Sequence, residues 1–292
     1  MSAVHAWWPA SPCGAGCLAG REPTVGWPRR AARLATVLCV LMASLLLVPL
    51  LSLLGSRVRE WVVRRVFRGV LRAVGVRLRV VGADGLDARG RGMLVVNNHV
   101  SWLDIVAINA VRPMRAVAKR DIASWPVLGW LVTAARSVYL HRESLRSLPA
   151  TVEELAAALR DGSMVNASPE GTTWCGLTHG RFRPALFQAA IDGGVPVLPV
   201  ALRFRLADGT PTTAPSFIGD DTIIDSVRRV AALRGLVLEV HVLPEIAPGR
   251  AADRRELAAL AEAAVDTVLI ADQPTPAVKG TALPRPVAHP AT

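Results

Sequence analysis

Residues 94–105 read LVVNNHVSWLDI, in which an apolar, β-branched run passes through two asparagines and a histidine into a segment of helical pattern. A strand followed by a turn and a helix is the repeating unit of an α/β fold. Helical patterns also fill the gaps between further strand-like runs, most clearly at 145–160 and 252–270. The strand-like runs are 76–81, 93–97, 115–118, 138–140, 164–167, 197–204 and 236–242.

This alternation predicts the fold class α/β, with a largely parallel sheet flanked by helices. In such sheets, ligands bind at the carboxyl ends of the strands, in the loops that lead into the helices. The polar residues that follow the strand-like runs are therefore the candidates for chemistry.

His99 and Asp104 are the first such candidates. In one continuous helix, a separation of five residues would leave the two side chains roughly 140° apart. If His99 instead lies in the loop before a helix that begins near Ser101, Asp104 can reach back to the imidazole. A carboxylate on one ring nitrogen fixes the tautomer and leaves the other nitrogen to accept a proton from a hydroxyl. We therefore expect a general base.

Ser101 is a conceivable nucleophile in the same segment. No GxSxG elbow accompanies it, however, which disfavours that role.

Three other segments carry residues of interest. Residues 168–174 read SPEGTTW, where Gly171 allows backbone N–H groups to approach an anion closely. Arg142 ends the run VYLHR and could donate two hydrogen bonds to a phosphate. Residues 195–202 read VPVLPVAL. Taken singly, these features are also typical of an ordinary turn, a solvated arginine and a buried strand.

Together and in this order, the four segments resemble the glycerolipid acyltransferase family that includes 1-acylglycerol-3-phosphate acyltransferase. The resemblance covers about residues 60–245. The matching residues are His99 and Asp104 of an NHxxxxD block, Arg142 of the second block, Glu170, Gly171 and Thr172 of an FPEGT block, and Pro199 of the fourth, with Lys119, Pro126 and Gly129 before the second.

The resemblance implies that His99 and Asp104 are catalytic and that Arg142, Glu170, Gly171, Thr172 and Lys119 bind the substrate. The implied reaction transfers a fatty acyl group from acyl-CoA or acyl-carrier protein to the free hydroxyl of 1-acylglycerol-3-phosphate, which forms phosphatidic acid.

Several positions depart from the family pattern. Arg136, His141, Ser168 and Thr173 stand where the family usually has Gly, an acid, Phe and Arg. The stretch PEGTTWCG and the segment from Phe217 onward look closer to lyso-ornithine lipid acyltransferases. A lyso-ornithine lipid or other lysolipid acyltransferase is therefore the alternative function, followed by a non-catalytic lipid-binding adaptor of the membrane surface.

An apolar run near the N-terminus predicts a membrane anchor. Residues 34–55 contain no charged side chain and match the ~20 residues with which a helix crosses a bilayer. The run exceeds the h-region of a signal peptide. Pro49 disfavours a straight helix, so a re-entrant or half-buried hairpin is the alternative.

Arginines flank this run unequally, four before it and six after it, which favours a catalytic domain on the cytoplasmic face of the cell membrane. Apolar residues between the later arginines predict an interfacial amphipathic helix on an anionic membrane surface. The alternative is a helix that packs this stripe on the protein core. The ten arginines are Arg21, Arg29, Arg30, Arg33, Arg57, Arg59, Arg64, Arg65, Arg68 and Arg72.

The net charge of +11 suits nucleic acid or anionic lipid as a partner, and the apolar run favours lipid. We expect a membrane lipid acceptor and no nucleic acid. The chain of 292 residues then divides into a poorly ordered leader (1–28), a membrane anchor with a basic amphipathic helix (29–75), an acyltransferase α/β domain (76–271) and a disordered Pro-rich tail (272–292).

The cysteines are Cys13, Cys17, Cys39 and Cys175, and they form no CxxC or other zinc-binding spacing. We therefore expect neither a disulfide framework nor a metal site, and no cofactor beyond the acyl donor.

Overall fold

A seven-stranded mixed sheet runs through the protein in the order β1-β7-β6-β2-β5-β3-β4. The computed structural model describes residues 9–18, 20, 22–51, 53–86, 90–141 and 144–270. All seven predicted strands are present, with ends that differ from the prediction by a residue at most. They are β1 (Arg77–Val81), β2 (Met93–Asn97), β3 (Arg115–Lys119), β4 (Val138–Leu140), β5 (Met164–Ala167), β6 (Val197–Arg205) and β7 (Val237–Val242).

The sheet is largely parallel, as the alternation of strands and helices predicts. Every neighbouring pair is parallel except β6 and β7, which pair antiparallel. The central strand β2 is buried along its whole length, because it lies between β5 and β6 and is covered on both faces.

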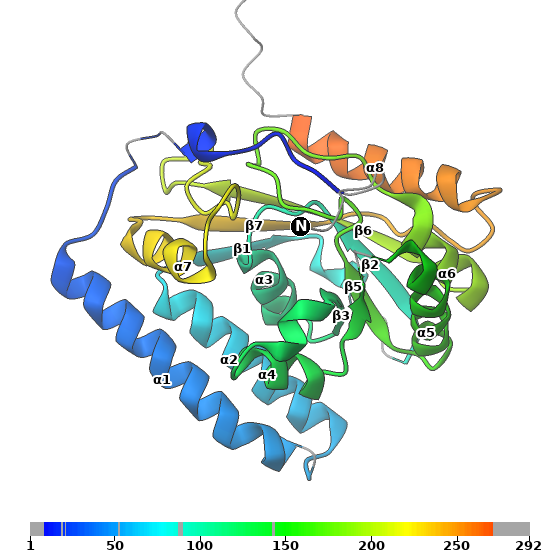
Figure 1. The fold of residues 1–292 in the computed structure, drawn as a ribbon, viewed down its shortest axis with the longest axis horizontal. Coiled ribbons are helices and arrows are strands. Elements are labelled where there is room, and N and C mark those ends of the chain that lie inside the picture. The colour runs from blue at the N-terminus through cyan, green and yellow to red at the C-terminus, as the bar shows by residue number, and fades with distance from the viewer. Residues whose placement is uncertain are drawn as a thin grey trace, which may run out of the picture.

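Helices cover both faces of the sheet (Figure 1). Along β2, Val95 points into one core and Leu94 and Val96 point into the other. The first core also contains residues of α3 (Leu103–Val111) and α7 (Ile223–Ala232). The second contains residues of α5 (Leu148–Arg160), α6 (Phe187–Gly193) and α8 (Arg254–Ile270). The short α4 (Leu128–Ala134) lies on the α3 side (Figure 1).

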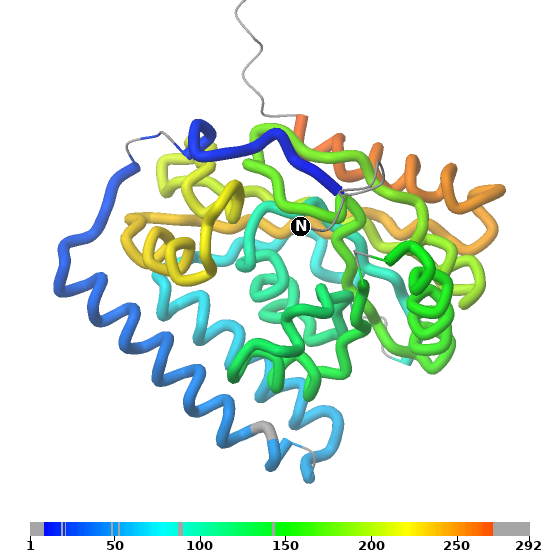
Figure 2. Tube along the Cα trace, viewed as in Figure 1, coloured from blue at the N-terminus to red at the C-terminus, as the bar shows by residue number. Residues whose placement is uncertain are grey.

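Two N-terminal helices form a hairpin beside the domain. α1 (Trp27–Leu51) includes Pro49, and a short turn leads back into α2 (Ser56–Ala73), as the tube view shows (Figure 2). Within the described residues, one segment, Trp27–Leu47, is long and apolar enough to cross a membrane. The guanidinium of Arg33 donates to the carbonyls of Ala231 and Leu233 at 2.9 and 2.7 Å, which ties the start of α1 to α7.

The C-terminal half of α2 packs on the protein core, as one of the two sequence interpretations expects. Phe67, Val70 and the buried Leu71 pack on the core of the domain, and Arg68 Nε donates to the carbonyl of Ala110 at 2.9 Å. Nearer the hairpin turn, Trp61 is 57% exposed.

The predicted leader is described only from Pro9, and 271–292, which take in the whole predicted tail, lie outside the described residues. From Pro9 to the 3₁₀ turn Ala15–Leu18, the chain runs along the domain beside the loop that follows β5.

Candidate functional site

His99 and Asp104 meet at the carboxyl end of β2. His99 lies in the loop between β2 and α3, and Asp104 lies in the first turn of α3. Asp104 Oδ2 is 2.9 Å from His99 Nδ1. The pair has the geometry expected for a histidine in the loop before a helix.

The Asp104 carboxyl group determines which nitrogen of the imidazole carries the proton. Its Oδ2 also accepts hydrogen bonds from the backbone N–H groups of Val100 and Ser101, at 2.7 and 2.9 Å. An oxygen surrounded by these donors accepts from Nδ1–H as well, so Nε2 is left with a free lone pair. The N–H groups of Val100 and Ser101 are occupied by Asp104 and are therefore not available to an oxyanion.

The His99 loop is held by hydrogen bonds from several parts of the chain. The backbone N–H of His99 donates to Glu170 Oε2 at 2.9 Å, and the His99 carbonyl accepts from the N–H of Trp174 at 2.8 Å. The carbonyl of Val100 accepts from the N–H of Phe217 at 2.9 Å. The imidazole is therefore carried by a backbone with little freedom to move.

Buried amides before His99 add to this support. The side chain of Asn98 accepts from the N–H of Leu202 at 2.8 Å and donates to the Leu202 carbonyl at 3.0 Å, which fastens the end of β2 to β6. Asn166 Nδ2 donates to Asn97 Oδ1 at 2.8 Å, which links β2 to β5. Sequence reasoning missed these roles, although an amide inside an otherwise apolar strand is the signal that reveals them.

Glu170 is buried behind the wall of the site. Burial away from water raises the pKa of Glu170 to about 9, and the hydrogen bond from the His99 N–H only partly opposes this effect. At neutral pH the side chain is therefore a neutral acid. It is absent from the residues that line the cavity described below, and its contact with the His99 N–H is that of a positioning residue.

The other predicted site residues lie around the same end of the sheet. Gly171 has a φ of +78°, and a Cβ at this position would come within 3.0 Å of Pro9. Thr172 follows it on the cavity wall. Lys119 ends β3, also lines the cavity and forms an ion pair with Asp121. Arg142 lies outside the described residues.

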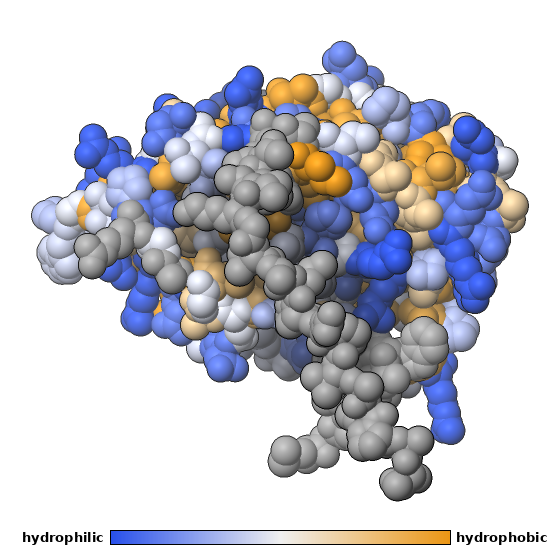
Figure 3. Space-filling view, turned by 90° about the horizontal axis from the view of Figure 1, so that it is seen from above, coloured by the Kyte–Doolittle hydropathy of each residue, from blue (hydrophilic) through white to orange (hydrophobic). Residues whose placement is uncertain are grey.

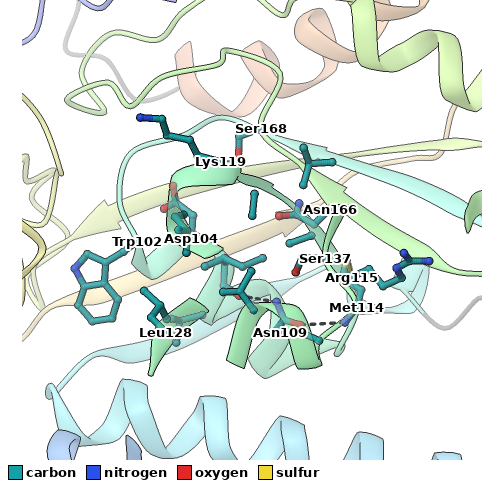
Figure 4. A pocket seen from close by; sticks show the side chains of 18 of the residues that line it. Trp102, Asp104, Asn109, Met114, Arg115, Lys119, Leu128, Ser137, Asn166 and Ser168 are labelled. Atoms are coloured by element: carbon teal, nitrogen blue, oxygen red, sulfur yellow. Dashed lines mark hydrogen bonds between the residues drawn. The ribbon is translucent and has the colours of Figure 1, made fainter. Parts of the chain in front are cut away.

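A large cavity of about 2610 Å³ opens in front of His99 and Asp104. Its polar end includes Lys119, Asn166 and Ser168, and Trp102 and Leu128 lie on the other side (Figure 4). The cavity continues between the domain and the helical hairpin, where apolar residues line it. These are Leu34, Val37 and Leu41 of α1, Val62, Val66 and Phe67 of α2, and Ile105 of α3.

The site thus combines a partly exposed histidine with a space suited to long apolar chains. The His99 side chain is 26% exposed, whereas Asp104 is buried. A cavity of this volume exceeds the roughly 300–1,000 Å³ of pockets for small ligands. A base at the polar end of an apolar cavity can act on a hydroxyl of an amphipathic molecule.

Comparison with known proteins agrees with these features. A profile of the family described as Acyltransferase matches residues 77–203. The 1-acyl-sn-glycerol-3-phosphate acyltransferase of Neisseria meningitidis is 36% identical over 205 residues, which cover 70% of this chain and 79% of that protein. The lyso-ornithine lipid O-acyltransferase of Pseudomonas aeruginosa is 36% identical over 217 residues, or 74% of this chain and 80% of that protein.

The fold also has a counterpart among solved structures. The crystal structure of the 1-acyl-sn-glycerophosphate acyltransferase of Thermotoga maritima superposes with a TM-score of 0.63 at 18% identity, over 83% of this chain and 96% of that one. The chain therefore belongs to the glycerolipid acyltransferase family and is a lysolipid acyltransferase of the 1-acylglycerol-3-phosphate acyltransferase type.

Proposed function

We propose that the protein is a membrane-bound enzyme that acylates the free hydroxyl of 1-acylglycerol-3-phosphate, with acyl-CoA or acyl-carrier protein as the donor. The observation that carries this proposal is the contact of 2.9 Å between His99 Nδ1 and Asp104 Oδ2 at the polar end of the apolar cavity.

In the proposed reaction, His99 Nε2 accepts the proton of the acceptor hydroxyl while its oxygen attacks the carbonyl carbon of the thioester. The tetrahedral intermediate collapses, the C–S bond breaks, and the imidazolium returns the proton to the leaving thiolate. Asp104 holds the ring and stabilises its positive charge. The products are a diacyl lipid and a free thiol, with no change of oxidation state.

The position of Ser101 fits direct transfer of the acyl group to the acceptor, without an acyl-enzyme intermediate. Ser101 is fully buried, and its hydroxyl oxygen accepts from the N–H of Leu103 at 3.4 Å. A side chain in that position does not reach a substrate in the cavity.

The hairpin of α1 and α2 is the proposed membrane contact. Leu46 and Leu53, near its turn, are 76% and 81% exposed. The side of the molecule seen from above shows instead a mixture of hydrophilic and apolar side chains (Figure 3). Because α2 returns alongside α1 and carries many arginines, we propose that the hairpin dips into the cytoplasmic leaflet without crossing it.

We infer the identity of the acceptor head group from the basic side chains at the polar end of the cavity. Lys119 lies there, and the sequence places Arg142 shortly after β4, which ends at the same edge of the sheet as β2 and β5. Cations suit a phosphomonoester, which supports 1-acylglycerol-3-phosphate as the acceptor. The relative named as a lyso-ornithine lipid O-acyltransferase makes that lysolipid the second candidate.

The test uses purified protein in detergent with oleoyl-CoA and a panel of lysolipids. We expect release of free CoA that is fastest with 1-acylglycerol-3-phosphate and is abolished by His99→Ala. Preference for lyso-ornithine lipid would overturn the proposed identity of the acceptor head group. Activity retained by a folded His99→Ala variant would overturn the proposed mechanism.

A further inference from the structure

Three of the four cysteines form a cluster that their spacing in the sequence did not reveal. Cys13 and Cys17 lie at the N-terminal segment that runs along the domain, and Cys175 lies in the loop after β5. Their sulfur atoms all lie within 4.8 Å of one another. The sequence analysis expected neither a disulfide framework nor a metal site, and the fold brings these three thiols together.

Polar groups of the loop after β5 contact two of these sulfur atoms. The N–H of Cys175 donates to Cys13 Sγ at 3.3 Å, and Cys175 Sγ lies 3.6 Å from Thr178 Oγ1. Cys175 is followed by the sharp bend at Gly176, which has a φ of +87°. Ordinary buried thiols do not need such donors, whereas metal-bound thiolates are oriented and stabilised by hydrogen bonds of this kind.

We propose that Cys13, Cys17 and Cys175 bind one zinc ion. Thiolate sulfur selects zinc among common divalent ions, and three cysteines supply three of the four ligands of a tetrahedral zinc site. With Zn–S bonds of about 2.3 Å, tetrahedral sulfur atoms lie roughly 3.8 Å apart, so the cluster needs to contract by only about 1 Å. Among the described residues, no further His, Cys, Asp or Glu joins the cluster, and the proposal assigns the fourth position to water.

The ion would fasten the N-terminal segment to the wall of the active site. Pro9, Ala10, Ser11 and Cys13 line the same cavity as His99. The described part of the segment is also held by the hydrogen bond of 2.6 Å from Thr213 Oγ1 to the Cys17 carbonyl. Cys175 directly follows Trp174, whose N–H holds the His99 carbonyl. The proposed ion is structural, and it does not take part in the acyl transfer.

A disulfide between two of the three thiols is the rival interpretation, which would leave the third cysteine without a role. The experiment measures zinc in the full chain, purified in detergent without chelators and under reducing conditions. We expect about one zinc per chain, and loss of that zinc in Cys13→Ser, Cys17→Ser and Cys175→Ser. Cys39→Ser, at an exposed position of α1, is the matched control and should keep its zinc.

Two measurements on the unmutated chain do not depend on how the variants fold. Exchange of zinc for cobalt should produce the charge-transfer absorption of cobalt–thiolate bonds. Removal of the metal by a chelator should expose the segment near Ala15 to a protease while leaving the α/β domain intact. Absence of zinc from the wild-type chain, zinc retained equally by Cys175→Ser, or a disulfide between two of these cysteines in the non-reduced protein would each overturn the proposal.

Discussion

The backbone N–H of His99 donates to Glu170 Oε2 across 2.9 Å, although 71 positions separate the two residues in the sequence. The proposed base is thus held from behind by an acid that burial keeps protonated. The NHxxxxD and PEGT segments therefore form one structural unit, in which the second positions the first.

The stability of the protein should fall as pH rises, because of Glu170. Its pKa is about 9 in the folded protein, against an ordinary value of 4.5 for a glutamate exposed to water. A folded-state pKa above the unfolded value gives stability that is complete below pH 4.5 and is lost progressively up to pH 9. The midpoint of thermal unfolding should therefore drop over this range in the wild type. Glu170→Gln keeps an acceptor for the His99 N–H, and its unfolding midpoint should depend less on pH. If the midpoints of the wild type and of the variant fell equally with pH, the raised pKa of Glu170 would not be the cause.

Asp104→Asn should slow catalysis much more than it weakens binding. The amide cannot stabilise an imidazolium and can orient the ring in the wrong tautomer, so we expect kcat to fall by roughly 10³–10⁴-fold with little change in KM. Steady-state release of CoA measures both constants. Asp208→Asn, in an exposed turn after β6, is the control and should behave as wild type. A mainly KM effect of Asp104→Asn would argue against its proposed role.

Ser101→Ala should remain active. Loss of its weak bond to the Leu103 N–H resembles loss of a helix cap and should cost about 0.5–2 kcal/mol of stability. Intact-mass measurement after mixing with acyl-CoA alone should show no acylated protein. Inactivity as deep as that of His99→Ala, together with an acyl adduct on the wild type, would instead identify Ser101 as a nucleophile.

Gly171→Ala should destabilise the wall of the site. The left-handed φ of +78° costs a side chain about 1–2 kcal/mol, and the new methyl group would press on Pro9 at 3.0 Å. We expect a lower unfolding midpoint and a raised KM for the lysolipid. Gly209→Ala has a φ of +90° in an exposed turn with open space around it, so it should lower the midpoint while leaving KM unchanged.

Membrane binding should depend on the exposed leucines of the hairpin. Replacing Leu46 and Leu53 by Ser removes apolar surface from the proposed contact and should weaken binding to anionic vesicles by at least about ten-fold. Ile270→Ser, at a 58% exposed position of α8 away from the hairpin, is the matched control. Co-sedimentation with vesicles compares them, and equal binding of both variants would place the contact elsewhere.

The sequence was sufficient for the strands, because each apolar run is short, β-branched and followed by polar or glycine residues. It also indicated the meeting of His99 and Asp104, since only a loop before a helix brings residues five apart together. The direction of β7 was not predictable. The sequence pattern of a strand, a helix and a second strand is the same whether the second strand runs parallel or antiparallel to the first. Nor could spacing bring Cys13 and Cys175 together, as they are 162 positions apart.

The contact of Glu170 with the His99 backbone was not predictable for a related reason. The PEGT turn shows a carboxyl group beside a glycine, which suggests direct contact with a ligand. Only the folded chain shows that Glu170 turns away from the cavity and toward the His99 backbone.

β7 pairs antiparallel with β6, and the edge strand β1 pairs parallel with β7. β1 therefore runs in the direction opposite to β2, β5 and β6. β1 therefore begins near the carboxyl ends of β2 and β5, and α2 leads into that beginning within a few residues. In an all-parallel sheet the same short connection would have placed the hairpin at the far end of the domain. One reversed pair of strands thus puts the proposed membrane contact and the proposed base on the same side of the enzyme.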